Sequence, residues 1–475
     1  MKRLLLALFA IVALPISALA QGVDNPSAPN FPPNKNSFCV TGDSISEEQT
    51  TQLLSYSGAT VAEDSNRGWN VWLAALTGQA VSVDPANNYA AAGYTSADVL
   101  AHIGTAIAAK CGAYSLMVGV NDCNGGVAPA TTQANYNSIV QALWNTGAVV
   151  YVSTILPWDS STQSKRDCTW QNNAYIRNTF STRPGVVVVD PAFYYGDPAS
   201  ATNAPKTGYT QLGDAIHPSG LGGYWVAQPF IAPVKLFFAP KLDPVTSVTD
   251  VYSATSTMGN LLAGMPLQVA NAAGSKGTGV SGSVATSWNV DITAGTSGNT
   301  GTLAVAASVC ETHTCNSALT ADGRIWQQLV LSGAITQGGG GICTGSVACV
   351  SALTYVKFNY TNAGVLSNIS PGDQVRAECL VQIDPGVANV NGINLEIWWY
   401  DGTTQYWTGT LDGIPADALV NPVSTVTLYL RTRAFTAPAT NTFSDVRVML
   451  TFPNSASYSP TGTFRVGNCA LRKMQ

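Results

Sequence analysis

Residues 38–46 read Phe-Cys-Val-Thr-Gly-Asp-Ser-Ile-Ser, an apolar run followed by glycine, aspartate and serine. The apolar run predicts a short strand, and residues 46–55 predict a helix directly after it. Ser44 would then lie between the strand and the helix, with its hydroxyl at the carboxyl edge of a sheet. A simple helix cap is the alternative, because Ser44 and Glu47 have capping-box spacing. Ser46 and Gln49 have the same spacing, so the helix could be capped without Ser44.

Histidine is scarce in this chain, which has only three in 475 residues. Histidine is the usual general base near neutral pH, so a serine nucleophile would have almost no choice of partner. His217 lies in Asp-Ala-Ile-His-Pro-Ser, residues 214–219. Asp214 is three residues earlier, close enough for its carboxylate to reach the ring. Ser44, His217 and Asp214 therefore suggest a Ser-His-Asp hydrolase.

Strands and helices are predicted to alternate over residues 37–230. The strands are predicted at 38–40, 116–120, 149–156 and 186–189, with short extended runs at 81–83 and 89–91. The helices are predicted at 46–55, 96–109 with Ser96 as cap, 132–144, 170–180 and 221–230. This alternation indicates right-handed crossovers and a parallel sheet covered on both faces. Ligands of such sheets bind outside the carboxyl ends of the strands.

Two further residues follow predicted strands and can donate N–H groups. Gly93 could bring its backbone N–H close to a developing oxyanion, and Asn121 could offer its side-chain amide. An ordinary turn glycine and an ordinary cap residue are the alternatives.

Four blocks in order resemble the SGNH/GDSL hydrolase superfamily. They are Gly42-Asp43-Ser44, Gly93, Gly119-Val120-Asn121-Asp122 and Asp214-Ala215-Ile216-His217. The resemblance covers about residues 37–230. It implies a three-layer α/β/α, flavodoxin-like domain with a parallel sheet. Thr41 and Ile45 depart mildly from the family's first block, where an aromatic residue and leucine are common.

The resemblance also implies a role for each residue. Ser44 would be the nucleophile, His217 its base and Asp214 the group that orients His217. The oxyanion hole would consist of the Ser44 and Gly93 backbone N–H groups and the Asn121 side chain. No metal or organic cofactor is implied. Asp43 is expected to support the turn.

A second domain is expected at 261–475, after a proline-punctuated linker at 231–260. Nine short alternating runs predict an all-β sandwich, at 287–292, 302–309, 325–331, 354–359, 374–383, 394–400, 424–433, 446–452 and 463–471. A β-sandwich appended to a secreted esterase looks like a carbohydrate-binding jelly roll. Five aromatic residues cluster in it, namely Trp398, Trp399, Tyr400, Tyr406 and Trp407. Trp399 and Trp407 are candidate ligand platforms, although core packing is the better interpretation for most of these rings. Adjacent Trp398 and Trp399 must point to opposite faces of a strand, so at most one should be exposed.

Composition narrows the range of partners. Charged residues are 10% of the chain and the net charge is −5. No basic cluster could neutralise phosphates, which excludes nucleic acid as a partner. Residues 1–20 have the pattern of a secretory signal peptide, and no later segment is long and apolar enough for stable membrane insertion. We therefore expect a secreted, extracellular or periplasmic protein; the oligomeric state is not predictable.

Ten cysteines in an exported chain favour disulfides. They divide four and six between the domains. Expected pairs are Cys310–Cys315, Cys343–Cys349 and, by elimination, Cys379–Cys469, with Cys123–Cys168 preferred in the first domain. Zinc bound by Cys310, His313 and Cys315 is the rival interpretation.

These observations favour a serine esterase that hydrolyses ester groups, O-acetyl above all, on a polysaccharide or oligosaccharide. Trp158, in an insertion after a strand, could form a wall of the substrate cleft. A lipid or aryl-ester esterase is the alternative within the enzyme class. A non-catalytic carbohydrate-binding surface protein is the alternative outside it.

Overall fold

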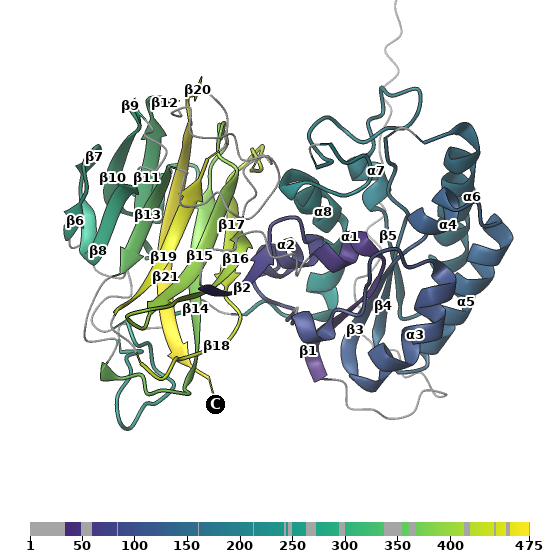
Figure 1. Ribbon diagram of the computed structural model, residues 1–475, viewed down its shortest axis with the longest axis horizontal. Helices are drawn as coiled ribbons and strands as arrows, with labels where there is room; N and C mark the ends of the chain where they lie inside the picture. Colours follow the sequence, from purple (N-terminus) through teal and green to yellow (C-terminus); the bar gives the residue numbers. More distant parts are fainter. Residues whose placement is uncertain are drawn as a thin grey trace, which may run out of the picture.

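The chain forms two domains that lie side by side in the computed structural model (Figure 1). The structure describes residues 34–48, 59–82, 84–159, 161–211, 213–241, 244–245, 249–262, 272–293, 300–336, 354–360, 367–412, 419–440, 443–452 and 457–474. Residues before about 240 form an α/β domain, and those after about 270 form a β-sandwich. The predicted signal peptide lies outside the described residues and stays a prediction.

A parallel four-stranded sheet, in the order β1-β3-β4-β5, forms the centre of the α/β domain among the described residues. The strands are β1 (Asn34–Gly42), β3 (Cys111–Met117), β4 (Val149–Ser153) and β5 (Val186–Val189). The helices are α1 (Ser44–Glu47), α2 (Trp69–Leu76), α3 (Ser96–Ala108), α4 (Val120–Asn124), α5 (Pro129–Trp144), α6 (Gln163–Phe180), α7 (Pro191–Tyr195) and α8 (Gly220–Phe237), with a short 3₁₀ turn at Pro85–Asn87. The prediction of an α/β domain with a parallel sheet is confirmed.

Alternating side chains of the strands bury both faces of this sheet. Cys39 and Val150 pack into a cluster with α3, α5 and α6. Phe38 and Tyr151 pack into a cluster with α2 and α8, where the ring of Trp69 stacks on Phe230 at 4.5 Å. Helices on both sides thus hold the strand ends, and whatever follows them, in fixed positions.

Several boundaries in this domain differ from those predicted. Thr95, and not Ser96, caps α3, in a capping box with Asp98. The last helix runs to Phe237 in spite of two internal prolines, so the predicted linker begins inside it. Prolines usually end helices, which is why the sequence placed the end too early. The extended runs near 81–83 and 89–91 make only isolated bridges with β1, at Ser82 and Asn88.

The second domain consists mainly of two large sheets. One has the order β17-β14-β21-β11-β10-β7, with β18 beside β14, and the other β2-β16-β15-β19-β13-β8-β6. Each predicted run coincides with a strand: β8 (Val284–Thr293), β10 (Ala304–Glu311), β11 (Ile325–Ser332), β13 (Tyr355–Tyr360), β14 (Gln374–Ile383), β15 (Gly392–Tyr400), β17 (Val426–Arg431), β19 (Phe443–Thr451) and β21 (Gly462–Lys473). Strands beyond the nine predicted are β6 (Ala273–Lys276), β7 (Val280–Gly282), β9 (Thr300–Gly301), β12 (Ile335–Thr336), β16 (Gln405–Asp412), β18 (Phe435–Thr436) and β20 (Ser457–Tyr458). The many strands agree with a sandwich, and its jelly-roll topology stays a prediction.

One strand of the sandwich comes from the other domain. β2 (Ala59–Ser65) follows α1 in sequence but pairs in parallel with β16, at the edge of a sandwich sheet. The sequence assigned residues 37–230 to the α/β domain and did not indicate this pairing with the sandwich. The two domains therefore share a sheet, and α2 directly follows the shared strand.

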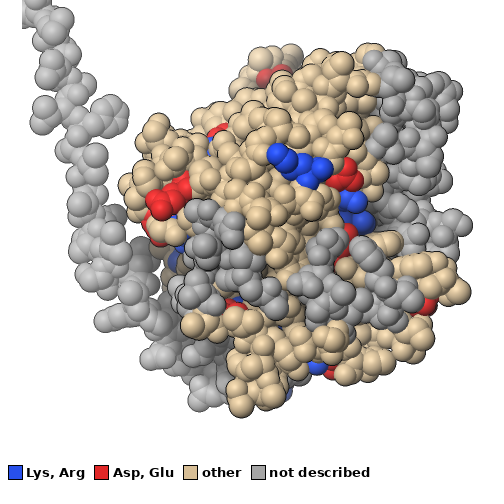
Figure 2. Space-filling view, turned by 90° about the vertical axis from the view of Figure 1, so that its left-hand side faces the viewer, with Lys and Arg blue, Asp and Glu red and all other residues tan. Residues whose placement is uncertain are grey.

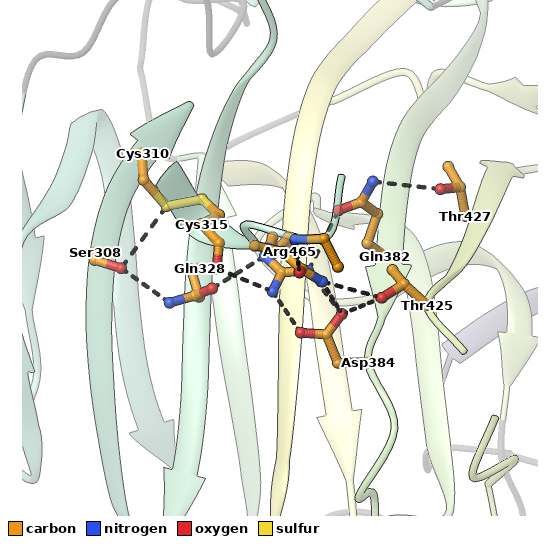
Figure 3. A network of polar contacts seen from close by, with 11 residues as sticks. Ser308, Cys310, Cys315, Gln328, Gln382, Asp384, Thr425, Thr427 and Arg465 are labelled. Carbon is orange, nitrogen blue, oxygen red and sulfur yellow. Dashed lines mark hydrogen bonds and ion pairs between the residues drawn. A yellow bond between two sulfur atoms is a disulfide. The ribbon is translucent and has the colours of Figure 1, made fainter. Parts of the chain in front are cut away.

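A buried arginine ties three strands of the sandwich together (Figure 3). Arg465, 1% exposed, donates from Nε to Gln328 at 3.0 Å and from Nη1 to Asp384 at 2.9 Å, and it forms an ion pair with Asp384 through Nη2. Asp384 also accepts from Thr425 at 2.7 Å. Since a buried charge is tolerated only when it is paired and hydrogen-bonded, this network is a structural element of the core.

Four disulfides join the described cysteines, namely Cys39–Cys111, Cys123–Cys168, Cys310–Cys315 and Cys379–Cys469. The expected pairings among them are confirmed, and Cys343 and Cys349 lie outside the described residues. The Cys310–Cys315 disulfide leaves no thiolate for the zinc alternative. No helix in the described part of the chain is long and apolar enough to cross a membrane. The outer end of the sandwich is largely uncharged (Figure 2), in keeping with the low content of charged residues.

Candidate active site

Ser44 is the first residue of α1, directly after the carboxyl end of β1. The turn between them requires glycine at position 42, where φ is +156°. A Cβ there would lie 2.0 Å from the Met117 carbonyl oxygen on neighbouring β3. Gly42 thus lets β1 run close to β3 up to its last residue and then turn, which places Ser44 at the sheet edge.

Asp43 stabilises this turn through its side chain. Its carboxylate, 1% exposed, accepts a hydrogen bond from the Ile45 N–H at 3.1 Å and caps α1. Ser44 is therefore not the cap, and its hydroxyl remains available. Burial raises the pKa of Asp43 to about 7, against the lowering effects of the Ile45 N–H bond and nearby His217.

The three side chains that the sequence singled out are brought together. Ser44 Oγ lies 2.8 Å from His217 Nε2, and His217 Nδ1 lies 2.7 Å from Asp214 Oδ2. With the proton on Nδ1, the ring donates to Asp214 and accepts from the Ser44 hydroxyl. This is the hydrogen-bond order that a serine nucleophile with a histidine base requires.

Asp214 is fixed by the backbone of its own loop. Its Oδ1 accepts from the N–H groups of Ile216, at 2.7 Å, and His217, at 3.0 Å. Burial alone would raise the pKa of Asp214, but these two bonds and the His217 ring outweigh it and lower the pKa. The carboxylate is thus ionised at neutral pH and oriented toward the ring.

The triad is accessible at the surface. The side chains of His217 and Asp214 are 26% and 35% exposed. Ser46, the nearest other serine, is fully buried and accepts a bond from the Trp69 indole. The other histidines lie elsewhere: His102 stacks on Tyr94, and His313 lies near Glu311 in the sandwich.

Gln211 holds the histidine loop through hydrogen bonds, a role that the sequence did not predict. Its N–H donates to the His217 carbonyl at 3.0 Å, and its amide donates to the Pro218 carbonyl at 3.2 Å. The same amide group is held by Glu48, at 2.6 and 2.7 Å, and by Arg67, at 2.7 Å. A lone glutamine in a loop carries no sequence pattern, so only the fold reveals this role.

The predicted oxyanion donors lie on segments beside β1. Residues 88–91 run along this strand, with Tyr89 N–H bonded to Val40 and Ala91 N–H to Gly42. Gly93 follows with φ of +77° and open space where a Cβ would be. Asn121, in the first turn of α4, uses one amide N–H on the Tyr94 carbonyl at 2.9 Å, which orients its side chain.

Asp122 joins the segments that carry Gly93 and Asn121, a role that the sequence did not predict. Its buried carboxylate accepts from the Ser96 N–H at 2.8 Å, from the Ser96 hydroxyl at 2.5 Å and from Thr132 at 3.1 Å. It thereby joins the starts of α3, α4 and α5 next to Gly93 and Asn121. A buried, fully bonded carboxylate of this kind positions the donors and does not react itself.

Residues 40–223 match the model of the GDSL-like Lipase/Acylhydrolase family. The matched residues lie in the α/β domain, which is thus similar to this family over most of its length. No curated protein matches the chain. A solved structure titled as a putative lipolytic protein of the G-D-S-L family, from Desulfitobacterium hafniense DCB-2, is 18% identical with a TM-score of 0.33, covering 42% of this chain and 98% of that one.

Two further solved structures have similar scores. A carbohydrate esterase family 3 protein from Talaromyces cellulolyticus is 18% identical, with a TM-score of 0.32 and coverage of 42% of this chain and 97% of that one. An acetyl esterase mutant with acetate ion has the same identity, 18%, with a TM-score of 0.32 and coverage of 42% and 97%.

The α/β domain has a pocket of about 630 Å³ lined by residues of α6, α7 and the loops next to them. Trp158 lines it, although this side chain is only 5% exposed, and the next residue, Asp159, donates its N–H to the Ala215 carbonyl at 2.9 Å. Trp170 on α6 and Phe193 on α7 also line it and are 70% and 76% exposed. The sequence did not single out either ring, because an aromatic residue on a helix usually packs inward.

Trp399 and Trp407 were the predicted ligand platforms of the sandwich. Trp399 is 1% exposed and packs near Phe435, so the prediction that it contacts a ligand is wrong. Trp398, on the opposite face of β15, is the half-buried ring of the pair and lies by Arg447 and Tyr400. The side chain of Trp407 lies outside the described residues.

Proposed function

We propose that the protein is an exported serine esterase that removes O-acyl groups, acetyl above all, from carbohydrate. The proposal rests on one observation: Ser44, His217 and Asp214 form a continuous hydrogen-bonded chain at an accessible sheet edge, with contacts of 2.8 and 2.7 Å. The four disulfides favour an oxidising compartment, as export requires.

The chemistry follows from this chain of bonds. Ser44 Oγ attacks the ester carbonyl while its proton passes to His217 Nε2, and Asp214 stabilises the imidazolium. His217 then gives the proton to the leaving alcohol oxygen, and the acyl group stays on Ser44. Water then attacks the acyl group while His217 takes its proton, and the proton passes to Ser44 Oγ as the carboxylic acid is released. The N–H groups of Ser44, Gly93 and Asn121 would stabilise the oxyanion, each worth roughly 3–4 kcal/mol.

The pocket lined by α6 and α7 is the candidate binding site for the carbohydrate. Exposed aromatic rings gathered in one hollow are typical of ligand sites, and Trp170 and Phe193 offer flat faces to the apolar C–H surface of a sugar. Trp158, which lines this hollow, is followed by Asp159, whose N–H donates to the Ala215 carbonyl in the histidine loop.

The nucleophile is tested with Ser44→Ala on a p-nitrophenyl ester series and on acetylated xylan and pectin, with released acetate measured. We expect a loss of at least about 10³-fold in kcat with an unchanged melting temperature. Ser138→Ala, an exposed serine on α5, is the matched control and should keep full activity. Activity that survives in Ser44→Ala would refute the assignment.

The substrate class is tested separately. If the carbohydrate proposal holds, Trp170→Ala and Phe193→Ala raise KM for acetylated oligosaccharide several-fold and leave p-nitrophenyl acetate hydrolysis unchanged. Leu236→Ala, at 75% exposure, is the control for loss of an exposed apolar group. Cleavage of long-chain acyl esters alone would favour the lipid esterase alternative.

A further inference from the structure

The two domains meet across a polar interface as well as through the shared sheet. Gln79, after α2, donates from its amide to the Tyr429 carbonyl at 2.9 Å. Arg431 on β17 donates to the Ser82 hydroxyl at 3.0 Å, and Arg433 donates to Asp64 at 2.9 and 2.6 Å. Figure 1 shows α2 and β2 next to β16 and β17 at this boundary.

A pocket of about 300 Å³ lies in this interface, walled by both domains. The α/β domain contributes Asp64, Gln79 and Ser82 among others, and the sandwich contributes Arg376, Arg431 and Arg433. This volume is at the lower end of the range for small-molecule sites. It is enough for a sugar-sized ligand, and none of these residues belongs to the catalytic site.

Cations outnumber carboxylates around this pocket. Arg433 is neutralised by Asp64, and Arg472, opposite Arg376 in the ladder, by Asp250. Lys241 is a further cation close to Arg431. Burial, and then the charge of Arg431, lower the pKa of Lys241. Two carboxylates remain. Glu378 accepts from the Tyr429 hydroxyl, and its charge partly offsets the cations because it raises the pKa of Arg431; exposed Asp84 accepts from the Ala86 N–H.

Arg376 and Arg431 are the cations left over. Within the described residues, neither forms an ion pair with a carboxylate, and the Arg376 Nε atom is buried without a hydrogen-bond partner. Burial, and then the charge of Arg376, lower the pKa of Arg431. Two guanidinium groups that repel each other in a partly buried pocket are unfavourable unless an anion joins them.

Arg465 shows what a completed arginine site looks like in the same domain. Its three guanidinium nitrogens all donate to acceptors, and Asp384 neutralises its charge (Figure 3). Arg376 and Arg431 have the donors of such a site, but within the described residues no carboxylate forms an ion pair with either of them. A bidentate oxyanion would supply the negative charge, because carboxylate and phosphate match the guanidinium fork.

We propose that the interdomain pocket binds a sugar-sized acid through a carboxylate or phosphate group that bridges Arg376 and Arg431. The ligand would neutralise both cations and contact both domains, which would stabilise the interface. The site does not depend on the esterase assignment, since it requires no reaction at Ser44.

The test measures binding to the full-length protein without any ester present. Galacturonate, glucose 6-phosphate and inorganic phosphate are added at about 10 mM, with galactose and with sodium chloride of equal ionic strength as controls. We expect at least one acid to raise the melting temperature by about 2–4 °C above the controls. A response to galacturonate alone identifies a uronate site, and a response to phosphates identifies a phosphate site.

Arg376→Gln and Arg431→Gln should each weaken binding of that acid tenfold or more by calorimetry. Arg324→Gln, a surface arginine paired with Asp322, is the matched control and should bind normally. Without ligand, Arg376→Gln should melt at or above the wild-type temperature, because it removes an unpaired cation. The proposal is overturned if no acid exceeds the salt control, if both variants bind as wild type, or if ligand-free Arg376→Gln melts more than about 5 °C lower.

Discussion

Two polar networks, one in each domain, use similar groups to opposite ends. In the α/β domain, Asp214, His217 and Ser44 form a chain that ends in a hydroxyl at the surface. In the sandwich, Arg465 is buried and bonded through all three guanidinium nitrogens, and half-buried Asp384 accepts from Arg465 and Thr425. In the first network the Ser44 hydroxyl remains accessible to a substrate, whereas in the second the Arg465 guanidinium uses its nitrogens on acceptors within the protein. The reactive network therefore differs from the structural one because one of its groups can still bind and attack a ligand.

The largest expected effect separates activity from stability in the first network. Asp214→Asn would present an amide N–H₂ or a weaker acceptor to His217 Nδ1, which disturbs the ring's tautomer and removes the charge that stabilises imidazolium. We expect kcat on p-nitrophenyl acetate to fall by about 10⁴ at pH 7. The melting temperature should change little, and Asp197→Asn, a surface carboxylate, should behave as wild type.

The second network should give the reverse result. Arg465→Met leaves Asp384 without its cation, and we expect unfolding to become easier by about 3–5 kcal/mol in denaturant titrations. Activity per folded molecule on the aryl ester should stay within about twofold, because the triad is in the other domain. Adding Asp384→Leu to Arg465→Met should restore much of the stability. A triad-like loss of activity in the folded variant would contradict this division of roles.

Buried Asp43 and half-buried Asp384 should change the stability with pH in opposite directions. Burial raises the pKa of Asp43 to about 7, whereas bonds from Arg465 and Thr425 outweigh burial and lower the pKa of Asp384. Between about pH 4 and 7 the unfolded chain has Asp43 ionised while the folded one keeps it protonated, so stability falls as pH rises. The Asp43→Asn variant should lose this slope, so its free energy of unfolding gains roughly 3–4 kcal/mol on the wild type over that range and then levels off.

The Asp384 contribution has the opposite sign. It is fully present above the unfolded pKa, near 4, and is lost as pH falls below it. Denaturant titrations of Asp384→Asn and Asp43→Asn from pH 3 to 9 should therefore diverge from the wild type in opposite directions. Parallel profiles would show that the two carboxyls do not differ as the structure indicates.

The smallest expected effect concerns the support of the histidine loop. Gln211→Leu removes the amide bonds to Pro218 and Glu48 while the backbone bond to His217 remains. We expect kcat to fall about tenfold with KM nearly unchanged, as for a residue that positions the base. Gln211→Glu serves as the comparison, since it keeps the acceptor for Arg67 but places a charge beside Glu48 and should be at least as impaired.

Local patterns were enough to predict much of this molecule. The alternation of strands and helices, the nine sandwich strands and the local Cys310–Cys315 disulfide all depend on residues near one another in sequence. Gly42, Ser44 and the 214–217 loop could be found because a strand-to-turn junction and a scarce histidine leave marks in the sequence. Contacts made across long separations left no such mark.

β2 is the clearest of these, because residues 59–65 carry no sign that their partner, β16, lies some 350 residues later. Trp398 and Trp399 show the same limit on a small scale. Alternation along β15 says that they face opposite sides, but only the packed second sheet decides that Trp399 is the buried one. Gln211 and Asp122 act through hydrogen bonds to segments far away in sequence. Arg376 and Arg431 differ from other buried arginines only in that no carboxylate of the described segments forms an ion pair with them.

The types of the elements and the residues able to react can be read from the chain alone, since backbone preferences and functional groups are local properties. Which of these groups meet depends on the fold. It brought Ser44 and His217 within 2.8 Å across 173 positions, and it enclosed Arg465 in acceptors while leaving Arg376 without an acid. The physical reason is that bond partners and burial are set by the packing of whole sheets and helices.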